Sequence, residues 1–217
     1  MVLAFLCFFA KKEYSPQSWL KYMILLTEMK SMQNTVSDYI NSKIINIRSE
    51  VLFREAEDEF FYFYNINSAM RKLKKAIEYT PYHLKSIVLY ADICYLKGKF
   101  DKALNLYFLA VKIKGKDIKL LASIANCYNS LKKFDESLEF CNAALKIISE
   151  DSFLLSNQVI ELKINNLVSL KRFDEANRVL VQFSDLLKEN FAGSLYATLN
   201  EKIKLYEKLR YSGLKIV

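Results

Sequence analysis

The most regular pattern along the chain is a series of apolar residues at helical spacing between residues 84 and 115. In its first half the apolar side chains are three, one and three residues apart, which keeps them on one face of a helix. The same spacing returns after Gly98, and the pattern stops at Gly115, as helices commonly do at a glycine. The apolar positions are Ile87, Tyr90, Ala91 and Cys94, then Ala103, Leu106, Tyr107 and Ala110. This stretch therefore predicts two helices joined by a short turn.

The joint between these two helices occurs three times in the chain. Each copy has a basic turn, an aromatic residue, an acidic helix start and a small residue. The aromatic residues are Phe100, Phe134 and Phe173, which are 34 and 39 residues apart. A joint that recurs at this period is typical of repeated helical hairpins. We expect the three rings to be buried, and the five additional residues before Phe173 predict a longer helix or loop there.

Extended to the whole chain, this periodicity predicts one all-α domain over residues 1–217. The glycine and proline counts of 4 and 2 are too low for a sheet protein with many tight turns. Near the start, Ser15-Pro16 predicts the beginning of one helix and Thr35 the approximate beginning of a second. The expected segments are an edge helix (1–15), a divergent repeat (16–49), four further repeats (50–83, 84–117, 118–156 and 157–190) and a C-terminal capping helix (191–211).

The first ten residues, Met1 to Ala10, are almost wholly apolar. A spanning helix needs about 20 apolar residues, and a signal peptide needs a basic start and a cleavage site. Two interpretations remain open. The segment is half of a repeat that closes the N-terminal edge, or Val2–Ala10 contacts a membrane. An edge of this kind could also be covered by a second copy of the chain, so a homo-oligomer is possible.

The complete pattern resembles the tetratricopeptide repeat (TPR) family, whose 34-residue motif alternates large and small residues on two helices. Ile87, Tyr90, Ala91 and Cys94 hold the four first-helix places of that motif. One period later the matching residues are Leu121, Ile124, Ala125, Tyr128, Ser137, Cys141 and Ala144. The last repeat also fits, except for Lys163. The resemblance is clearest over residues 84–190, and it implies a right-handed α-solenoid of antiparallel helix pairs with a C-terminal capping helix.

The resemblance also implies a function, because TPR proteins are similar in holding an extended peptide or a partner's helix in a concave groove. The groove is lined by first helices, so its side chains should lie one turn away from the packed stripe. Asn126 and Asn165 are 39 residues apart and occupy equivalent places, where an amide could both donate to and accept from a bound backbone. The expected groove residues are Lys85, Asp92, Tyr95, Lys119, Asn126, Asn129, Gln158, Glu161 and Asn165. The sequence therefore favours a scaffold that binds a protein or peptide partner.

The charge of the chain leaves nucleic acid as a less favoured partner. The formal net charge is +8, and lysines gather between residues 112 and 119. Basic residues are nevertheless interleaved with acidic ones along the chain, which is typical of solvated helix faces. Because most aromatic residues fall on the packed stripe, few remain to stack on bases.

Little in the sequence supports catalysis, a metal site or a cofactor. His83 is the single histidine, and its place in a predicted loop indicates a surface residue. Cys7, Cys94, Cys127 and Cys141 form no C-x-x-C pair and lie in apolar helical contexts, so buried free thiols are expected. No glycine-rich phosphate-binding motif occurs. We therefore expect a cytoplasmic protein that is not an enzyme and has no cofactor.

Overall fold

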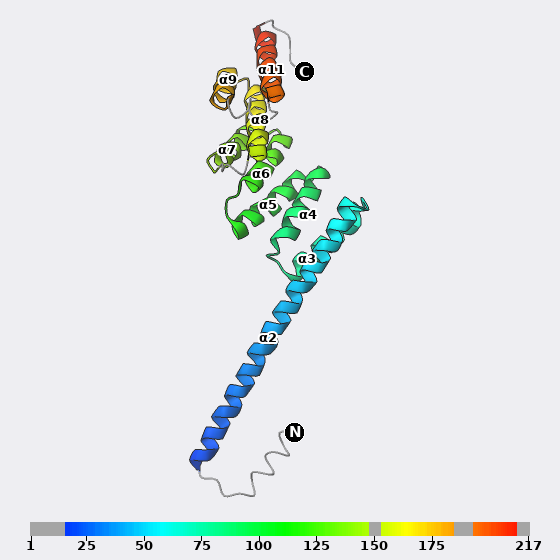
Figure 1. Ribbon diagram of the computed structural model, residues 1–217, viewed down its shortest axis with the longest axis vertical. Helices are drawn as coiled ribbons and strands as arrows, with labels where there is room; N and C mark the ends of the chain where they lie inside the picture. The colour runs from blue at the N-terminus through cyan, green and yellow to red at the C-terminus, as the bar shows by residue number, and fades with distance from the viewer. Residues whose placement is uncertain (1–15, 148–152, 185–192, 212–217) are drawn as a thin grey trace.

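Helices stack in consecutive pairs along the long axis of the molecule (Figure 1). The structure, a computed structural model, describes residues 16–147, 153–184 and 193–211, and all regular secondary structure in these ranges is α-helical. Its helices are α2 (Pro16–Phe61), α3 (Ile66–Tyr79), α4 (Leu84–Leu96), α5 (Phe100–Lys114), α6 (Ile118–Ser130), α7 (Phe134–Leu145), α8 (Phe153–Ser169), α9 (Phe173–Gln182) and α11 (Gly193–Tyr211). At the end of the row, α11 packs against α8 and α9. The prediction of an all-α solenoid of helix pairs with a C-terminal capping helix is confirmed.

The three repeated hairpin turns share one backbone conformation. Gly98, Lys132 and Lys171 hold the same place in these turns, with φ angles of 69°, 59° and 61°. In the second turn, the amide of Lys132 donates to the carbonyl of Asn129 at 2.8 Å, and the following amide donates to Tyr128 at 2.9 Å. The other two turns have the same pair of bonds, which satisfies carbonyls that a helix end would leave open. The basic turn of the sequence motif is therefore a C-terminal helix cap in which one residue has a left-handed backbone conformation.

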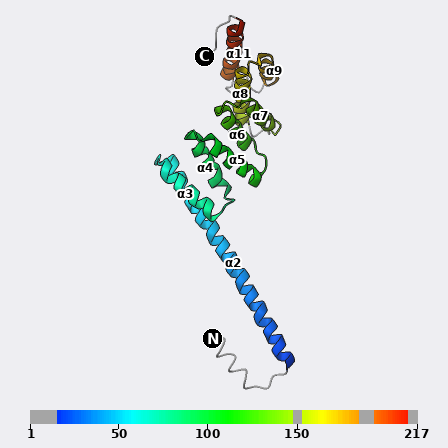
Figure 2. The same ribbon diagram turned by 180° about the vertical axis from the view of Figure 1, so that it is seen from behind.

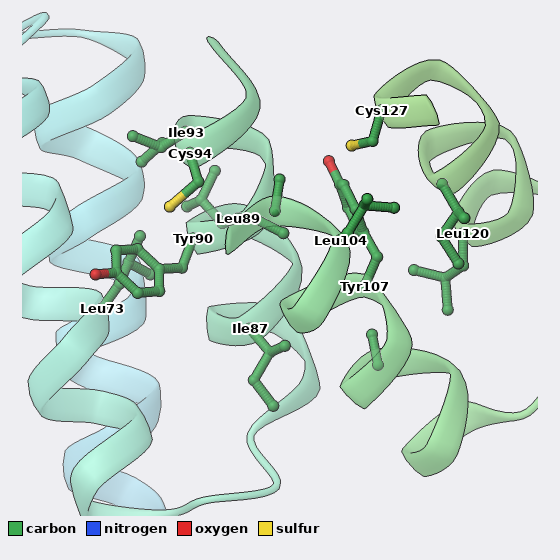
Figure 3. Packing of buried hydrophobic residues seen from close by; sticks show 14 of the residues in the cluster. Leu73, Ile87, Leu89, Tyr90, Ile93, Cys94, Leu104, Tyr107, Leu120 and Cys127 are labelled. Carbon is green, nitrogen blue, oxygen red and sulfur yellow. The ribbon is translucent and has the colours of Figure 1, made fainter. Parts of the chain in front are cut away.

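Small residues let neighbouring helices approach closely, as the repeat pattern requires. Ala91, Ala103 and Ala110 are fully buried, and the ring of Tyr107 fills space between α5 and its neighbours (Figure 3). Close approach of two helices needs short side chains at the crossing, and a large neighbour then occupies the remaining volume. The aromatic residues of the joint differ from this expectation. Phe173 is buried, whereas Phe100 and Phe134 are only half-buried.

The predicted divergent repeat over residues 16–49 is wrong, because no turn separates two helices there. A single helix of 46 residues, α2, runs from Pro16 to Phe61. Thr35, which we expected to begin a second helix, donates instead to the carbonyls of Ser31 (3.2 Å) and Met32 (2.8 Å). A hydroxyl bonded back to the preceding turn is compatible with a continuous helix. With no glycine, and no proline after Pro16, nothing in this stretch breaks the helix.

Only the C-terminal part of α2 belongs to the stack. Ser49, Phe53 and Ala56 are buried on the side that faces α3. The earlier part of the helix projects away from the other helices in both views (Figures 1 and 2). The predicted edge helix over residues 1–15 lies outside the described residues. The longer element expected before Phe173 is confirmed, since α8 has 17 residues where α4 and α6 have 13.

Candidate functional site

A cleft of about 320 Å³ lies between the end of α2, α4 and the start of α6. These are the first helices of three consecutive pairs, so the cleft occupies the face on which the sequence predicted a groove. Three of the nine expected groove residues line it, namely Lys85, Asp92 and Lys119. The other lining residues are Phe53, Glu57, Phe61, Leu84, Val88, Leu89, Lys114, Asp117 and Leu120. We call this the α2–α4–α6 cleft.

The α2–α4–α6 cleft has an apolar wall. Phe53 is buried at its base, Leu84 and Val88 are half-buried, and Phe61 is 55% exposed. A large exposed aromatic side chain beside a hollow is a common feature of binding surfaces, because it can bury area at little cost in side-chain entropy. The sequence analysis did not include the α2 residues Phe53, Glu57 and Phe61 among the expected groove residues. Extending the groove positions of α4 back by one repeat period would have indicated this part of α2.

Ion pairs fix several charged groups around the cleft. The Lys85 Nζ atom lies 2.9 Å from Glu50 Oε1 on α2 and 5.7 Å from the ring centroid of Phe53. This hydrogen bond is the main reason that the pKa of Glu50 is lowered. Lys114 forms a similar pair with Asp117 at 2.7 Å. Burial acts to raise the pKa of Asp117, but Lys114 and the helix-capping amides outweigh it and the pKa is lowered.

Asp92 is held at the cleft by a buried tyrosine. The hydroxyl of Tyr107 donates to Asp92 Oδ1 at 2.5 Å. Burial, then the charge of Asp92, raises the pKa of this hydroxyl well above its usual range, so the donor keeps its proton. Lys119 at the opposite wall is exposed and forms no ion pair with the described residues. The cleft thus offers the oriented carboxylate of Asp92, the carboxylate of Glu57 and the ammonium group of Lys119 beside an apolar wall.

The remaining expected groove residues lie outside this cleft, and several have structural partners. Tyr95 lies 3.2 Å from Ser130 Oγ, and Asn129 donates to Asn166 at 2.5 Å. Gln158 is exposed and Glu161 is half-buried.

Asn126 and Asn165 hold equivalent places in their helices, but their surroundings differ. Asn126 is exposed, whereas Asn165 Oδ1 accepts a hydrogen bond from Lys202 Nζ of α11 at 2.6 Å. The physical reason is position in the row, because the helix that follows α9 covers the second site. Repeat spacing alone carries no information about such an end contact.

Asn166 is a buried polar residue that the sequence analysis missed. Its side chain is fully buried and donates to Ser137 Oγ at 2.7 Å, while Ser137 donates to the carbonyl of Ala125 at 2.8 Å. With Asn129, these groups join α6, α7 and α8 in one hydrogen-bonded network. The available signal was its repeat place, because Asn166 stands 39 residues after the apolar residue Cys127 of the preceding first helix.

His83 is not the surface residue that its loop position predicted. Its side chain is 15% exposed, with Nε2 at 3.1 Å from Glu50 Oε2 and Nδ1 at 2.7 Å from Ser86 Oγ. An acid, a histidine and a serine in line resemble a nucleophilic triad. Ser86, however, is fully buried, so a substrate has no access to its hydroxyl. The line instead connects α2 to α4 beside the cleft.

The cysteines in the described part of the chain are free and buried, as predicted. They are Cys94, Cys127 and Cys141, and burial raises the pKa of each thiol. Cys7 lies outside the described residues, as does the predicted membrane-contacting segment Val2–Ala10.

Among the described helices, none combines the length and the apolar character needed to cross a membrane.

Comparison with known proteins gives a consistent result at the level of structure. No family model and no curated protein sequence matches the chain. Among solved structures, a tetratricopeptide repeat protein from Parabacteroides merdae ATCC 43184 superimposes with a TM-score of 0.61 and 19% identity, over 72% of this chain and 60% of that one. YrrB, described as a TPR protein with an unusual peptide-binding site, gives a TM-score of 0.57 and 13% identity, over 73% of this chain and 77% of its own.

PilF of Pseudomonas aeruginosa is similar over 80% of this chain and 79% of its own, with a TM-score of 0.58 and 15% identity. The chain therefore spans less than two thirds of the length of the Parabacteroides protein, and more than two thirds of the lengths of YrrB and PilF. The hairpin turns, the buried small residues and these likenesses agree with one another. Together they show that this chain has the fold of the tetratricopeptide repeat proteins.

Proposed function

We propose that the protein is an interaction scaffold that holds a segment of a partner protein in the α2–α4–α6 cleft. The observation that carries the proposal is the composition of the cleft. An apolar wall with the exposed ring of Phe61 lies beside Asp92 and Lys119, which belong to two successive first helices. Peptide recognition commonly combines an apolar anchor in a pocket with a few oriented polar groups.

The bound segment would place an apolar side chain against Phe61 and Val88. Its polar groups would meet Asp92 on one side and Lys119 on the other. Because Tyr107 holds the carboxylate of Asp92 in place, little ordering is needed when a ligand arrives. The solved protein YrrB, with its peptide-binding site, is an analogy that supports this type of ligand.

The test is a selection of peptides from a displayed random library on the full chain, followed by affinity measurements on two matched variants. Val88→Arg places a charge on the wall of the cleft. Val181→Arg places the same charge on an exposed position of α9, away from the cleft. We expect Val88→Arg to abolish binding of the selected peptides and Val181→Arg to retain it.

Circular dichroism of both variants verifies that the helices remain. Equal binding by the two variants would contradict the proposed site. A different outcome is that the chain binds nucleic acid and not the peptides, and releases the nucleic acid at raised salt. That outcome would favour the alternative of a basic nucleic-acid-binding repeat protein.

A further inference from the structure

A straight stripe of exposed apolar residues follows the projecting part of α2. Its members are between 41% and 67% exposed. They are Leu25, Met29, Met32, Val36, Ile40, Ile44, Ile47 and Val51. On a helix with 3.6 residues per turn, these positions stay within a band of roughly 120° over a length of about 39 Å. Residues 11 apart, such as Leu25, Val36 and Ile47, lie almost in line, since 11 residues complete about three turns.

The stripe faces away from α3. Ser49, Phe53 and Ala56, which pack toward α3, lie on roughly the opposite side of α2. Ile47 and Val51 are therefore open to another helix even where α2 joins the stack. A partner could cover the complete stripe without displacing α3.

A helix this long is poorly stable in water unless its apolar face is packed. Helices in proteins gain most of their stability from such packing. The stretch also contains several residues of low helix propensity, including Asn34, Thr35, Val36 and Asn41. The exposed stripe thus indicates a surface that another helix covers.

The spacing of the stripe favours a second copy of the same helix as the covering helix. The steps between its members are 4, 3, 4, 4, 4, 3 and 4 residues, which read the same from either end. In an antiparallel pair centred beside Asp38, every member therefore meets a member of the other copy. Leu25 faces Val51, Met29 faces Ile47, Met32 faces Ile44 and Val36 faces Ile40. Self-complementarity of this kind is what a two-fold interface requires.

Charges favour the antiparallel direction over the parallel one. In a parallel pair, flanking residues five positions apart meet across the interface, and this would bring Lys43 of each copy to Arg48 of the other. The antiparallel pair separates these like charges. Asp38 lies on the side of the helix away from the stripe, so the two copies of this carboxylate do not oppose each other.

We propose that the protein forms a homodimer through an antiparallel pair of α2 helices, joined by the stripe from Leu25 to Val51. The two helical stacks then lie at opposite ends of the paired helices. This inference does not depend on the proposed ligand of the α2–α4–α6 cleft.

Sedimentation equilibrium of the full chain over a wide concentration range is the first test. We expect the unmodified protein to have twice the mass of one chain. Val36→Glu should raise the dimer Kd by more than roughly a hundredfold, because each dimer would bury two unpaired carboxylates. A monomeric unmodified protein, or an unchanged dimer with Val36→Glu, would overturn the proposal.

A matched pair of substitutions separates the interface from a general loss of helix. Leu25 and Ile24 are adjacent and almost equally exposed, at 53% and 50%, but only Leu25 belongs to the stripe. Leu25→Glu should weaken the dimer, and Ile24→Glu should leave it intact with the same helical circular dichroism. Equal weakening by both would contradict the stripe.

Cross-linking determines the direction of the pair. Two variants are prepared in a Cys7→Ser background, one with Leu25→Cys and one with Val51→Cys. The second carries an added tag, so that mixed and like pairs differ in mass. The two variants are then mixed and oxidised. The antiparallel arrangement predicts a mixed disulfide between the two variants and none between two Leu25→Cys chains. A disulfide between Leu25→Cys chains would show a parallel pair and overturn the arrangement.

Discussion

Asn166 on α8 donates a hydrogen bond of 2.7 Å to Ser137 on α7, at a point where both side chains are fully buried. The Ser137 hydroxyl in turn donates to the carbonyl of Ala125 on α6. Asn129, also on α6, donates from its side-chain amide to the side-chain oxygen of Asn166. Because every member has a partner, the network fixes how three successive helices meet. A purely apolar contact would leave their relative register less defined.

Replacement of Asn166 should therefore destabilise the stack. Asn166→Ala removes two hydrogen bonds and leaves a small cavity, so we expect the free energy of unfolding to fall by about 2–3 kcal/mol. Urea unfolding followed by circular dichroism measures the change. Asn126→Ala, at an exposed position of α6, is the control and should change stability by less than about 0.5 kcal/mol. An equal effect of the two substitutions would show that the buried network contributes nothing.

Replacing a lysine that has a left-handed backbone conformation with glycine should stabilise the protein. Lys132 and Lys171 have φ angles of 59° and 61°, whereas the equivalent residue in the first turn is Gly98. A side chain in this conformation costs about 1 kcal/mol, and glycine avoids that cost. We expect Lys171→Gly to raise the midpoint of urea unfolding. Lys146→Gly is the control, since Lys146 has a φ of −75° and glycine brings no relief there. A decrease of the midpoint with Lys171→Gly would contradict this account of the turn.

Asn165 should matter for the attachment of α11 and not for ligand capture. Its side-chain oxygen accepts the hydrogen bond of Lys202 at 2.6 Å. With Asn165→Ala, we expect faster amide hydrogen exchange in α11 and unchanged exchange in α4, because only the end of the row loses a contact. Unchanged exchange in α11 would mean that this bond does not hold the helix. The same substitution should leave the peptides selected on the α2–α4–α6 cleft bound with their original affinity.

Local rules in the sequence were sufficient for the hairpins but not for the ends of the row. Turns at Gly98 and Lys132 follow from short motifs and from 3.6-residue spacing, which act over a few residues. The continuous helix α2 was missed because Thr35 can cap a new helix or bond back to the previous turn, and the sequence alone does not decide between them.

The candidate site was predictable in position and less so in membership. Lys85, Asp92 and Lys119 lie in one cleft because the repeat phase places them on the same face of successive first helices. Asn165 shares that phase, yet a contact with α11 removes it from the open face. Contacts between residues far apart in sequence, such as those of His83 and Glu50, depend on the tertiary arrangement and not on the repeat.

The buried thiols should make the protein sensitive to alkaline pH. Burial raises the pKa of Cys127 to about 12 and that of Cys141 to about 12, from a reference value of 9.0. Above pH 9 the unfolded chain loses these protons while the folded chain retains them. The stabilising contribution is therefore complete below pH 9 and declines as the pH rises toward 12.

Urea unfolding at a series of pH values above 8 measures this decline, which amounts to at most about 1.4 kcal/mol per pH unit for each thiol. Tyrosines and lysines also titrate in this range, so the informative quantity is the difference between variants. Cys141→Ala should be less stable at pH 8 because a buried sulfur is lost, but its stability should fall less steeply with pH. Parallel curves for the variant and the unmodified protein would contradict a buried, protonated thiol at residue 141, because a group absent from one of them could not then contribute to the slope.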